Sequence, residues 1–124
     1  MANPNIVNVA TIYGNTSSTA SSTISATLIA NNAAGSGEVL KINSIVVANV
    51  DGTSAADITI NVYSQDDLGG TAYALASTIA VPADASLIVV DKSTSFYLLE
   101  DQSIGATAGT AGDLVVTASW EQIS

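Results

Sequence analysis

The chain has 124 residues, 48% hydrophobic and 10% charged, which is enough apolar material for the core of one domain. Cys, His and Arg are absent, and this removes the usual thiol nucleophiles, proton shuttles, zinc ligands and bidentate phosphate-binding groups. Eleven carboxylates against only Lys41 and Lys92 give a net charge of -9. Two lysines cannot form a basic stripe, so neither nucleic acid nor an anionic membrane is an expected partner.

The first predicted strand covers residues 6–13. The chain start has neither a basic n-region nor a long apolar h-region, so we expect the protein to stay in the compartment where it is made. The absence of Cys excludes a disulfide framework but constrains the redox compartment only weakly. The Ser/Thr-rich segment 15–23 has the lowest complexity in the chain and predicts a mobile loop or arm.

Two strands are predicted before the middle of the chain. Residues 23–31 alternate weakly between apolar and polar side chains. Residues 39–50 are apolar on both faces around Ile45, Val46 and Val47, which is typical of a central strand covered on both sides.

The clearest alternation in the chain lies at residues 57–64. One face carries Ile58, Ile60 and Val62, and the other carries Thr59, Asn61 and Tyr63. Such a period of two predicts a strand with one core-facing side.

The second half of the chain predicts further strands at residues 73–81, 86–91, 95–100 and 103–108. The Ala-rich stretch 71–80 is the best alternative helix. At the C-terminal end, Leu114, Val116, Ala118 and Trp120 share one face, so that Trp120 is expected to close the core.

Turn signals separate these strands at residues 33–37, 51–52, 66–70, 82–84 and 109–112. No linker long enough to divide the chain appears, so residues 1–124 are predicted to form a single domain. Regularly spaced short strands predict an all-β fold, an antiparallel β-sandwich of about eight strands with jelly-roll or immunoglobulin-like topology.

Two acidic pairs are candidates for chemistry. Asp66 and Asp67, in a Gly-flanked loop, offer oxygen ligands for Ca²⁺, but their spacing matches no EF-hand and ordinary turn solvation is favoured. Glu100 and Asp101 offer a carboxylate pair for acid and base work, against the favoured reading of a strand end that leaves the core for solvent. Neither pair predicts a site, so no catalytic, cofactor or metal residue is assigned.

Neither the possible nucleophiles nor the aromatic rings of this sequence indicate a particular activity. Only Lys41, Lys92 or a carboxylate remains to activate a serine, and no Gly-x-Ser-x-Gly elbow or phosphate-binding loop occurs, so an enzyme is not expected. Apolar rings with polar tips can form a platform that stacks on sugars, but here the aromatic residues are spread over at least five candidate strands, and core or interface packing is favoured. These residues are Tyr13, Tyr63, Tyr73, Tyr97 and Trp120.

Four runs of sequence carry a resemblance to a known class of protein: Lys41–Gly52, Ala56–Tyr63, Ile79–Lys92 and Phe96–Ile104. Together they resemble the small β-rich virion structural proteins of tailed bacteriophages, especially those of marine and cyanobacterial phages. The resemblance covers residues 38–123, and the segment from Ile6 to Gly14 also fits. Similar proteins often carry Glu-Gly-Asp after the Tyr-Leu run, where this chain has Glu-Asp-Gln. The resemblance implies a place in the particle and no catalytic residues.

The leading functional hypothesis is therefore a capsid decoration or cement protein, located in the virion and assembled in the host cytoplasm. Its expected partners are further copies of itself, with a trimer favoured over a dimer, and the major capsid protein or other virion proteins. The alternatives are a neck, tail or fibre-associated module and a carbohydrate- or receptor-binding sandwich.

Overall fold

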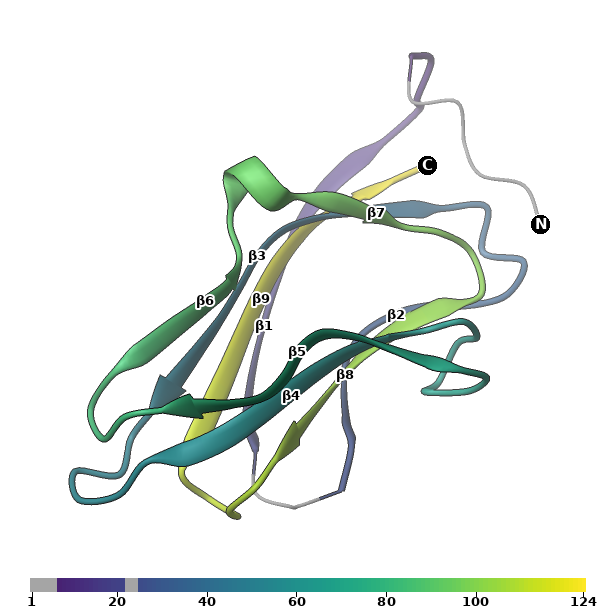
Figure 1. The fold of residues 1–124 in the computed structure, drawn as a ribbon. Coiled ribbons are helices and arrows are strands. Elements are labelled where there is room, and N and C mark those ends of the chain that lie inside the picture. Colours follow the sequence, from purple (N-terminus) through teal and green to yellow (C-terminus); the bar gives the residue numbers. More distant parts are fainter. Residues whose placement is uncertain (1–6, 22–24) are drawn as a thin grey trace.

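A computed structural model describes residues 7–21 and 25–124 (Figure 1). Within these ranges the chain forms nine β-strands and one short 3-10 helix, so the all-β prediction is confirmed, with one strand more than the expected eight. None of the described helices is long and apolar enough to cross a membrane. The elements are β1 (Ile12–Ser21), β2 (Thr27–Asn32), β3 (Val39–Asn49), β4 (Ala56–Tyr63), β5 (Ala72–Val81), β6 (Ser86–Val90), η1 (Lys92–Thr94), β7 (Phe96–Leu98), β8 (Gln102–Ala108) and β9 (Leu114–Ile123).

The strands form two antiparallel sheets that pack into a sandwich (Figure 1). Sheet A has the order β1-β9-β3-β6, with the short β7 also paired to β3, and sheet B has the order β2-β8-β4-β5. The first half of the chain thus pairs with the second half in reverse: β1 with β9, β2 with β8, β3 with β6 and β4 with β5. This double Greek key is a jelly roll, and it rules out the immunoglobulin-like alternative, in which consecutive strands more often share a sheet.

The core lies between the sheets and is built from aliphatic side chains that alternate inward along each strand. On β4, Ile58 and Ile60 are fully buried while the intervening Thr59 is half-exposed on the outer face, as predicted. β9 follows the same pattern, with Leu114 and Val116 buried. Burying such a side chain contributes about 1.5–3 kcal/mol, so the alternation fixes which face of each strand turns inward.

β3 is central in sheet A, as predicted, but it is not covered on both sides. Ile42, Ile45 and Val47 are buried, whereas Val46 and Ala48 are half-exposed on the outer face of the sheet. A bulge between Ile42 and Ser44 shifts the register of β3 against β9. The outer face of β3 therefore remains accessible in the single chain.

The N-terminal predictions are wrong in two respects. Residues 7–11, within the expected strand 6–13, lie outside any strand, and β1 begins only at Ile12. Residues 15–21 of the segment expected to be mobile form β1; the rest of that segment lies outside the described residues. Every residue of β1 pairs with β9 without a register shift. Backbone hydrogen bonds, with side-chain contacts such as the 3.1 Å bond between the Ser18 and Thr117 hydroxyls, hold a strand that has little apolar burial.

The alternative helix at residues 71–80 is wrong, because this stretch forms β5, as the strand prediction for 73–81 proposed. β5 is an edge strand whose pairing with β4 shifts register twice. At one of these irregularities Thr78 adopts φ 51°, and its N–H donates to the Thr59 hydroxyl at 3.0 Å. These shifts break the period of two, which explains why the sequence pattern is ambiguous here.

The remaining predicted strands are confirmed with shifted ends. The strand expected at 23–31 is β2, which begins at Thr27; residues 23 and 24 lie outside the described ranges. The strands expected at 86–91, 95–100 and 103–108 are β6, β7 and β8. All five predicted turns lie between strands, and Gly35, Gly37, Gly70 and Gly112 adopt the positive φ angles that such reversals need.

Trp120 packs against the core cluster, as expected, while remaining partly exposed. Its cross-strand neighbours are Ile42 on β3 and Asn15 on β1. We predict that Trp120→Ala lowers the free energy of unfolding by about 3 kcal/mol, the lower end of the range for large aromatic truncations, because burial is incomplete. Urea unfolding followed by circular dichroism measures this change. A midpoint within error of the wild type would show that Trp120 adds nothing to the core.

Candidate functional site

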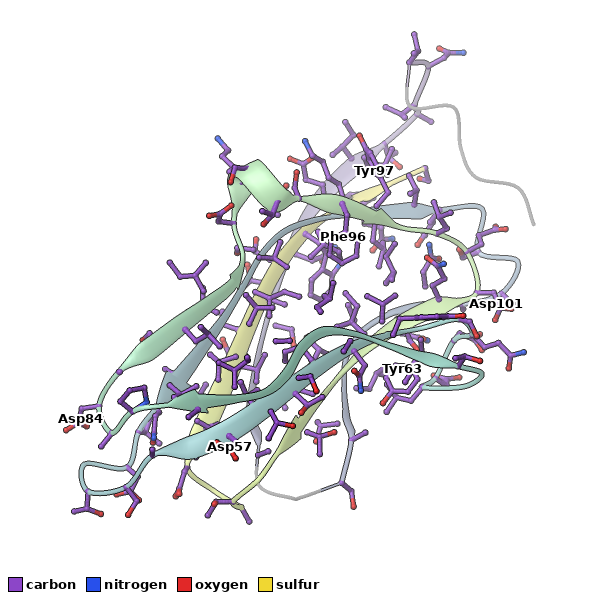
Figure 2. The ribbon with its side chains drawn as sticks, viewed as in Figure 1. Asp57, Tyr63, Asp84, Phe96, Tyr97 and Asp101 are labelled. Carbon is purple, nitrogen blue, oxygen red and sulfur yellow. The ribbon has the colours of Figure 1, made fainter. Side chains whose placement is uncertain are left out.

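Most of the acidic side chains lie at the two ends of the sandwich, where the loops are. At one end the loops 33–38, 64–71 and 99–101 meet; we call this the acidic loop end. At the opposite end lie the loops that carry Asp51 and Asp84, which are linked by a backbone hydrogen bond. Figure 2 shows Asp101 at the first end and Asp84 with Asp57 at the other.

Asp66 and Asp67 serve as hydrogen-bond acceptors between loops. The backbone N–H of Ala34 donates to Asp66 Oδ2 at 3.0 Å, and the Asn31 side-chain amide donates to Asp67 Oδ1 at 3.1 Å. Asn31 Oδ1 in turn accepts from the Asp67 N–H at 2.8 Å. Within the described residues no three acidic side chains gather around a possible metal position. The geometry therefore gives these two carboxylates a role in tying the β4–β5 loop to the end of β2.

Glu100 and Asp101 also join loops, and the expectation that they enter solvent is wrong for Glu100, which is buried. Its Oε1 accepts a hydrogen bond from the N–H of Gly37. Asp101, at φ 59°, accepts from the N–H of Asp66 at 3.1 Å. The pair thus diverges onto two different loops, which is the opposite of two carboxylates converging on one substrate atom.

Buried Ser103 completes this loop end. Its hydroxyl donates to the carbonyl of Gln65 at 2.8 Å and accepts from the N–H of Leu68 at 2.9 Å. Leu68 has φ 64°, and its side chain lies over Gly105, where an added Cβ would come within 2.7 Å of Leu68 Cδ2. Close approach over a glycine therefore seats the β4–β5 loop on sheet B.

Two buried asparagines, which the sequence analysis did not single out, fix the opposite ends of β3. The Asn32 amide donates to the carbonyls of Glu38 and Leu98, at 2.9 and 3.1 Å. The Asn49 amide donates to the carbonyls of Ser54 and Val81, both at 2.9 Å. Each asparagine therefore joins the end of its own strand to a strand of the sandwich that is distant in sequence. The only sequence signal was an Asn placed directly before turn residues.

The aromatic residues do not gather into a stacking platform. Tyr63 on β4 pairs with Ala72, whereas Tyr73 on β5 pairs with Val62, so the two rings leave opposite faces of sheet B. Tyr97 lies on sheet A opposite Lys41, well apart from Tyr63 (Figure 2). The partly buried Trp120 packs against the core, and Tyr13 lies on β1 opposite Gln122.

The two lysines occupy different elements. Lys41 is on the outer face of β3 with Tyr97 and Glu121 as cross-strand neighbours, and Lys92 is exposed at the start of η1. The Ser93 hydroxyl donates to a carboxylate oxygen, Asp91 Oδ1, at 2.6 Å, and the same oxygen accepts the backbone N–H groups of Ser93 and Thr94 and so caps η1.

The turn carboxylates of Asp51 and Asp91 are the groups with perturbed acidity. Hydrogen bonds from the Thr53 backbone N–H and then its hydroxyl hold the pKa of Asp51 below its ordinary value of 3.8. Donation from the hydroxyl and then the N–H of Ser93 lowers the pKa of Asp91, which caps η1. Both sets of hydrogen bonds stabilise the ionised form of a carboxylate in a turn.

Comparisons with known proteins support the fold. No family model and no curated protein matches the chain. In the acidic stable capsid structure of Helicobacter pylori bacteriophage KHP30, a chain 7% identical matches with a TM-score of 0.50, covering 94% of this chain and 90% of that chain. A chain of the Bacillus endospore appendages, a family of disulfide-linked pili, is 21% identical with a TM-score of 0.49, covering 91% of this chain and 87% of that one. A chain of infectious bursal disease virus, strain Gx, is 14% identical with a TM-score of 0.41, covering 93% and 32%. The likeness to the KHP30 chain is one of fold.

We predict that Asn49→Ala lowers the free energy of unfolding by about 2–3 kcal/mol, because it leaves the carbonyls of Ser54 and Val81 without their donor. Asn61→Ala is the matched control, since Asn61 lies half-exposed on the outer face of β4; we expect a change below about 1 kcal/mol. Chemical unfolding of both variants measures the difference. Equal losses would contradict a structural role for the buried amide.

We also predict an acid-dependent loss of stability through Asp51 and Asp91. Their pKa values are lower in the folded chain than in the unfolded one, so their contribution is fully present above the ordinary value of 3.8 and is lost as the pH falls through the folded values. Melting temperatures recorded from about pH 6 down to about pH 2.5 test this. Asp91→Asn should flatten the acid limb; a slope identical to that of the wild type would argue against the Asp91 contribution.

Proposed function

We propose that this chain is a non-enzymatic structural protein of a virion, and most specifically a capsid decoration or cement protein. The jelly roll is an architecture that viral capsid proteins use repeatedly. A chain that shares this fold over 94% of the present sequence comes from a bacteriophage capsid structure. The phage-like runs of the sequence, such as Lys41–Gly52 and Phe96–Ile104, support the same class independently of the fold.

The observation that carries the proposal is the separation of charge from the strands. The acidic side chains concentrate in loops, where several accept backbone N–H groups, while β1, β5 and β6 contain no charged residue. Uncharged Ser/Thr and aliphatic surfaces pack against other protein surfaces without desolvating a charge. A small domain with these surfaces is suited to repeated packing on an assembled shell. Many copies bound in this way would stabilise the shell.

The partners in this proposal are further copies of the chain, as a trimer, and the major capsid protein or another virion protein. Location in the virion, with assembly in the host cytoplasm, follows from that role. Neither nucleic acid nor membrane is a proposed partner, because Lys41 and Lys92 are the only cations among the side chains. The exposed carboxylates of Asp67 and Asp84, one at each loop end, can meet basic residues on the shell.

If the protein docks through uncharged surfaces, its binding to the shell should persist as the salt concentration is raised. Purified protein is incubated with particles that lack it, and occupancy is followed from low ionic strength to about 0.15 M and above. We expect occupancy to change little, because apolar and uncharged polar contacts are not screened. Dissociation below physiological salt would indicate charge-led docking instead.

The same particles distinguish the location. Labelled protein on the capsid surface supports decoration, whereas labelling confined to the neck, tail or fibres would contradict it and favour the alternative virion module. Binding to a glycan array with no binding to particles would favour a receptor-binding sandwich.

A further inference from the structure

β1 lies at the edge of sheet A and pairs with β9 alone among the strands of the described residues (Figure 1). Just before it, the N–H groups of Thr11 and Ser124 each donate to the carbonyl of the other, both at 3.0 Å. Such doubly bonded positions alternate along an antiparallel pair. The odd-numbered residues of β1 therefore bond to β9, and the even-numbered ones direct their backbone N–H and C=O groups outward. The outward residues are Ile12, Gly14, Thr16, Ser18 and Ala20.

The other edge strands of the two sheets are short or irregular. β2 shifts register once against β8, and β5 shifts twice against β4. β6 has five residues and a register shift against β3, and β7 has three residues. Short strands and bulges keep sheet edges from pairing with other chains. β1 has neither protection: it is a ten-residue strand without a register shift, a proline or a charged residue.

Gly14 lies in this outward row without a reason in the single chain. It pairs regularly with Glu121, its φ is outside the left-handed region, and an added Cβ would meet nothing within 4 Å. A glycine inside a strand weakens the strand and is typical of a place where another backbone approaches closely. No such backbone is found among the described residues, so Gly14 favours an approach by another chain.

We propose that two copies of the chain pair through β1, antiparallel and about a two-fold axis at Thr16. A row of alternating N–H and C=O groups is matched by an extended strand, and a second β1 supplies one of equal length. Outward residues must face outward residues in such a pair, and the longest pairing sets Thr16 opposite its own copy. Gly14 then faces Ser18, and Ile12 faces Ala20. In this register every outward N–H and C=O group of β1 bonds to the other copy.

The two-fold geometry selects a second copy as the partner. Residues at and near the axis face their own copies or close neighbours, so an acidic residue there would meet another carboxylate. Both lysines and all eleven acidic residues lie within residues 38–124, and residues 1–37 carry no charge. The β1 edge thus meets the condition that self-pairing imposes. A strand of another protein imposes no such condition and is commonly met with complementary charge, which β1 does not offer.

A two-fold contact gives assemblies with an even number of chains. Acting alone it gives a dimer, and together with the trimer of the proposed function, formed through another surface, it gives a hexamer. The inference rests on the proposed function only for its setting, in which copies of the chain meet. Its test uses purified protein without particles, so the two can fail separately.

The test is the mass of variants at Thr16, whose side chain is exposed on the outer face of sheet A. Thr16→Pro removes one outward N–H and leaves the bonds to β9, which the odd-numbered residues make. Thr16→Val keeps that N–H and is the matched control. Light scattering during size-exclusion chromatography should give the wild type and Thr16→Val an even multiple of the chain mass. Thr16→Pro should weaken association at least about tenfold and halve that mass.

Charged variants test the position of the axis. Thr16→Lys and Thr16→Glu each set like charges against each other across the axis and should dissociate the pair when used singly. An equimolar mixture of the two should restore it, because a lysine then faces a glutamate. Circular dichroism checks that every variant folds, so this second test remains if Thr16→Pro does not.

A wild type that runs as a monomer or a trimer would overturn the inference. So would a Thr16→Pro variant as associated as the wild type, or a Lys and Glu mixture no more associated than its components. A monomer whose binding to particles is abolished by Thr16→Pro would assign the β1 edge to a strand of the shell instead. A dimer that forms as expected but never binds a shell would contradict the proposed function and leave the β1 contact intact.

Discussion

The shortage of cations is the constraint on which the rest of this structure depends. Eleven carboxylates face two lysines, so charge pairing cannot neutralise most of them. The chain instead places carboxylates where backbone N–H groups are unpaired, in turns and at strand ends. Backbone donors are accepted by Asp51, Asp66, Asp91, Glu100 and Asp101. Hydrogen bonds to an ionised acceptor are stronger than neutral ones, so each loop is tightened by the charge that it carries.

This placement leaves the strands largely without charge and gives the two parts of the surface different roles. The loop ends are polar and internally bonded, and the buried amides of Asn32 and Asn49 anchor them to strands distant in sequence. The strands β5 and β6 contain no charged residue and carry exposed apolar side chains such as Tyr73 and Ile88.

Where the sequence alternates regularly, it predicts the fold well. On β4 and β9 the period of two gives both the strand and its buried face, because burial of Ile58 or Val116 outweighs local preferences. Prediction fails on β1, whose Ser/Thr side chains carry no such signal although the backbone pairs fully with β9. It is ambiguous on β5, where register shifts disrupt the alternation. The choice between jelly roll and immunoglobulin-like order depends on pairings between distant strands that no local pattern contains.

The loop-end contacts were less predictable than the strands. Burial of Glu100 depends on the N–H of Gly37, and the two carboxylates of the 66–67 pair accept donors on the β2–β3 segment. Such contacts exist only after the chain has wrapped around itself. The residue types correctly indicated that these acidic segments are turns. They could not show which other loop each turn would contact in the folded chain.

A cryo-electron microscopy map of particles carrying this protein tests the central claim most directly. The account predicts density for this chain on the capsid surface, packed against the subunits of the shell. Density confined to the neck, tail or fibres, with none on the capsid surface, would contradict it.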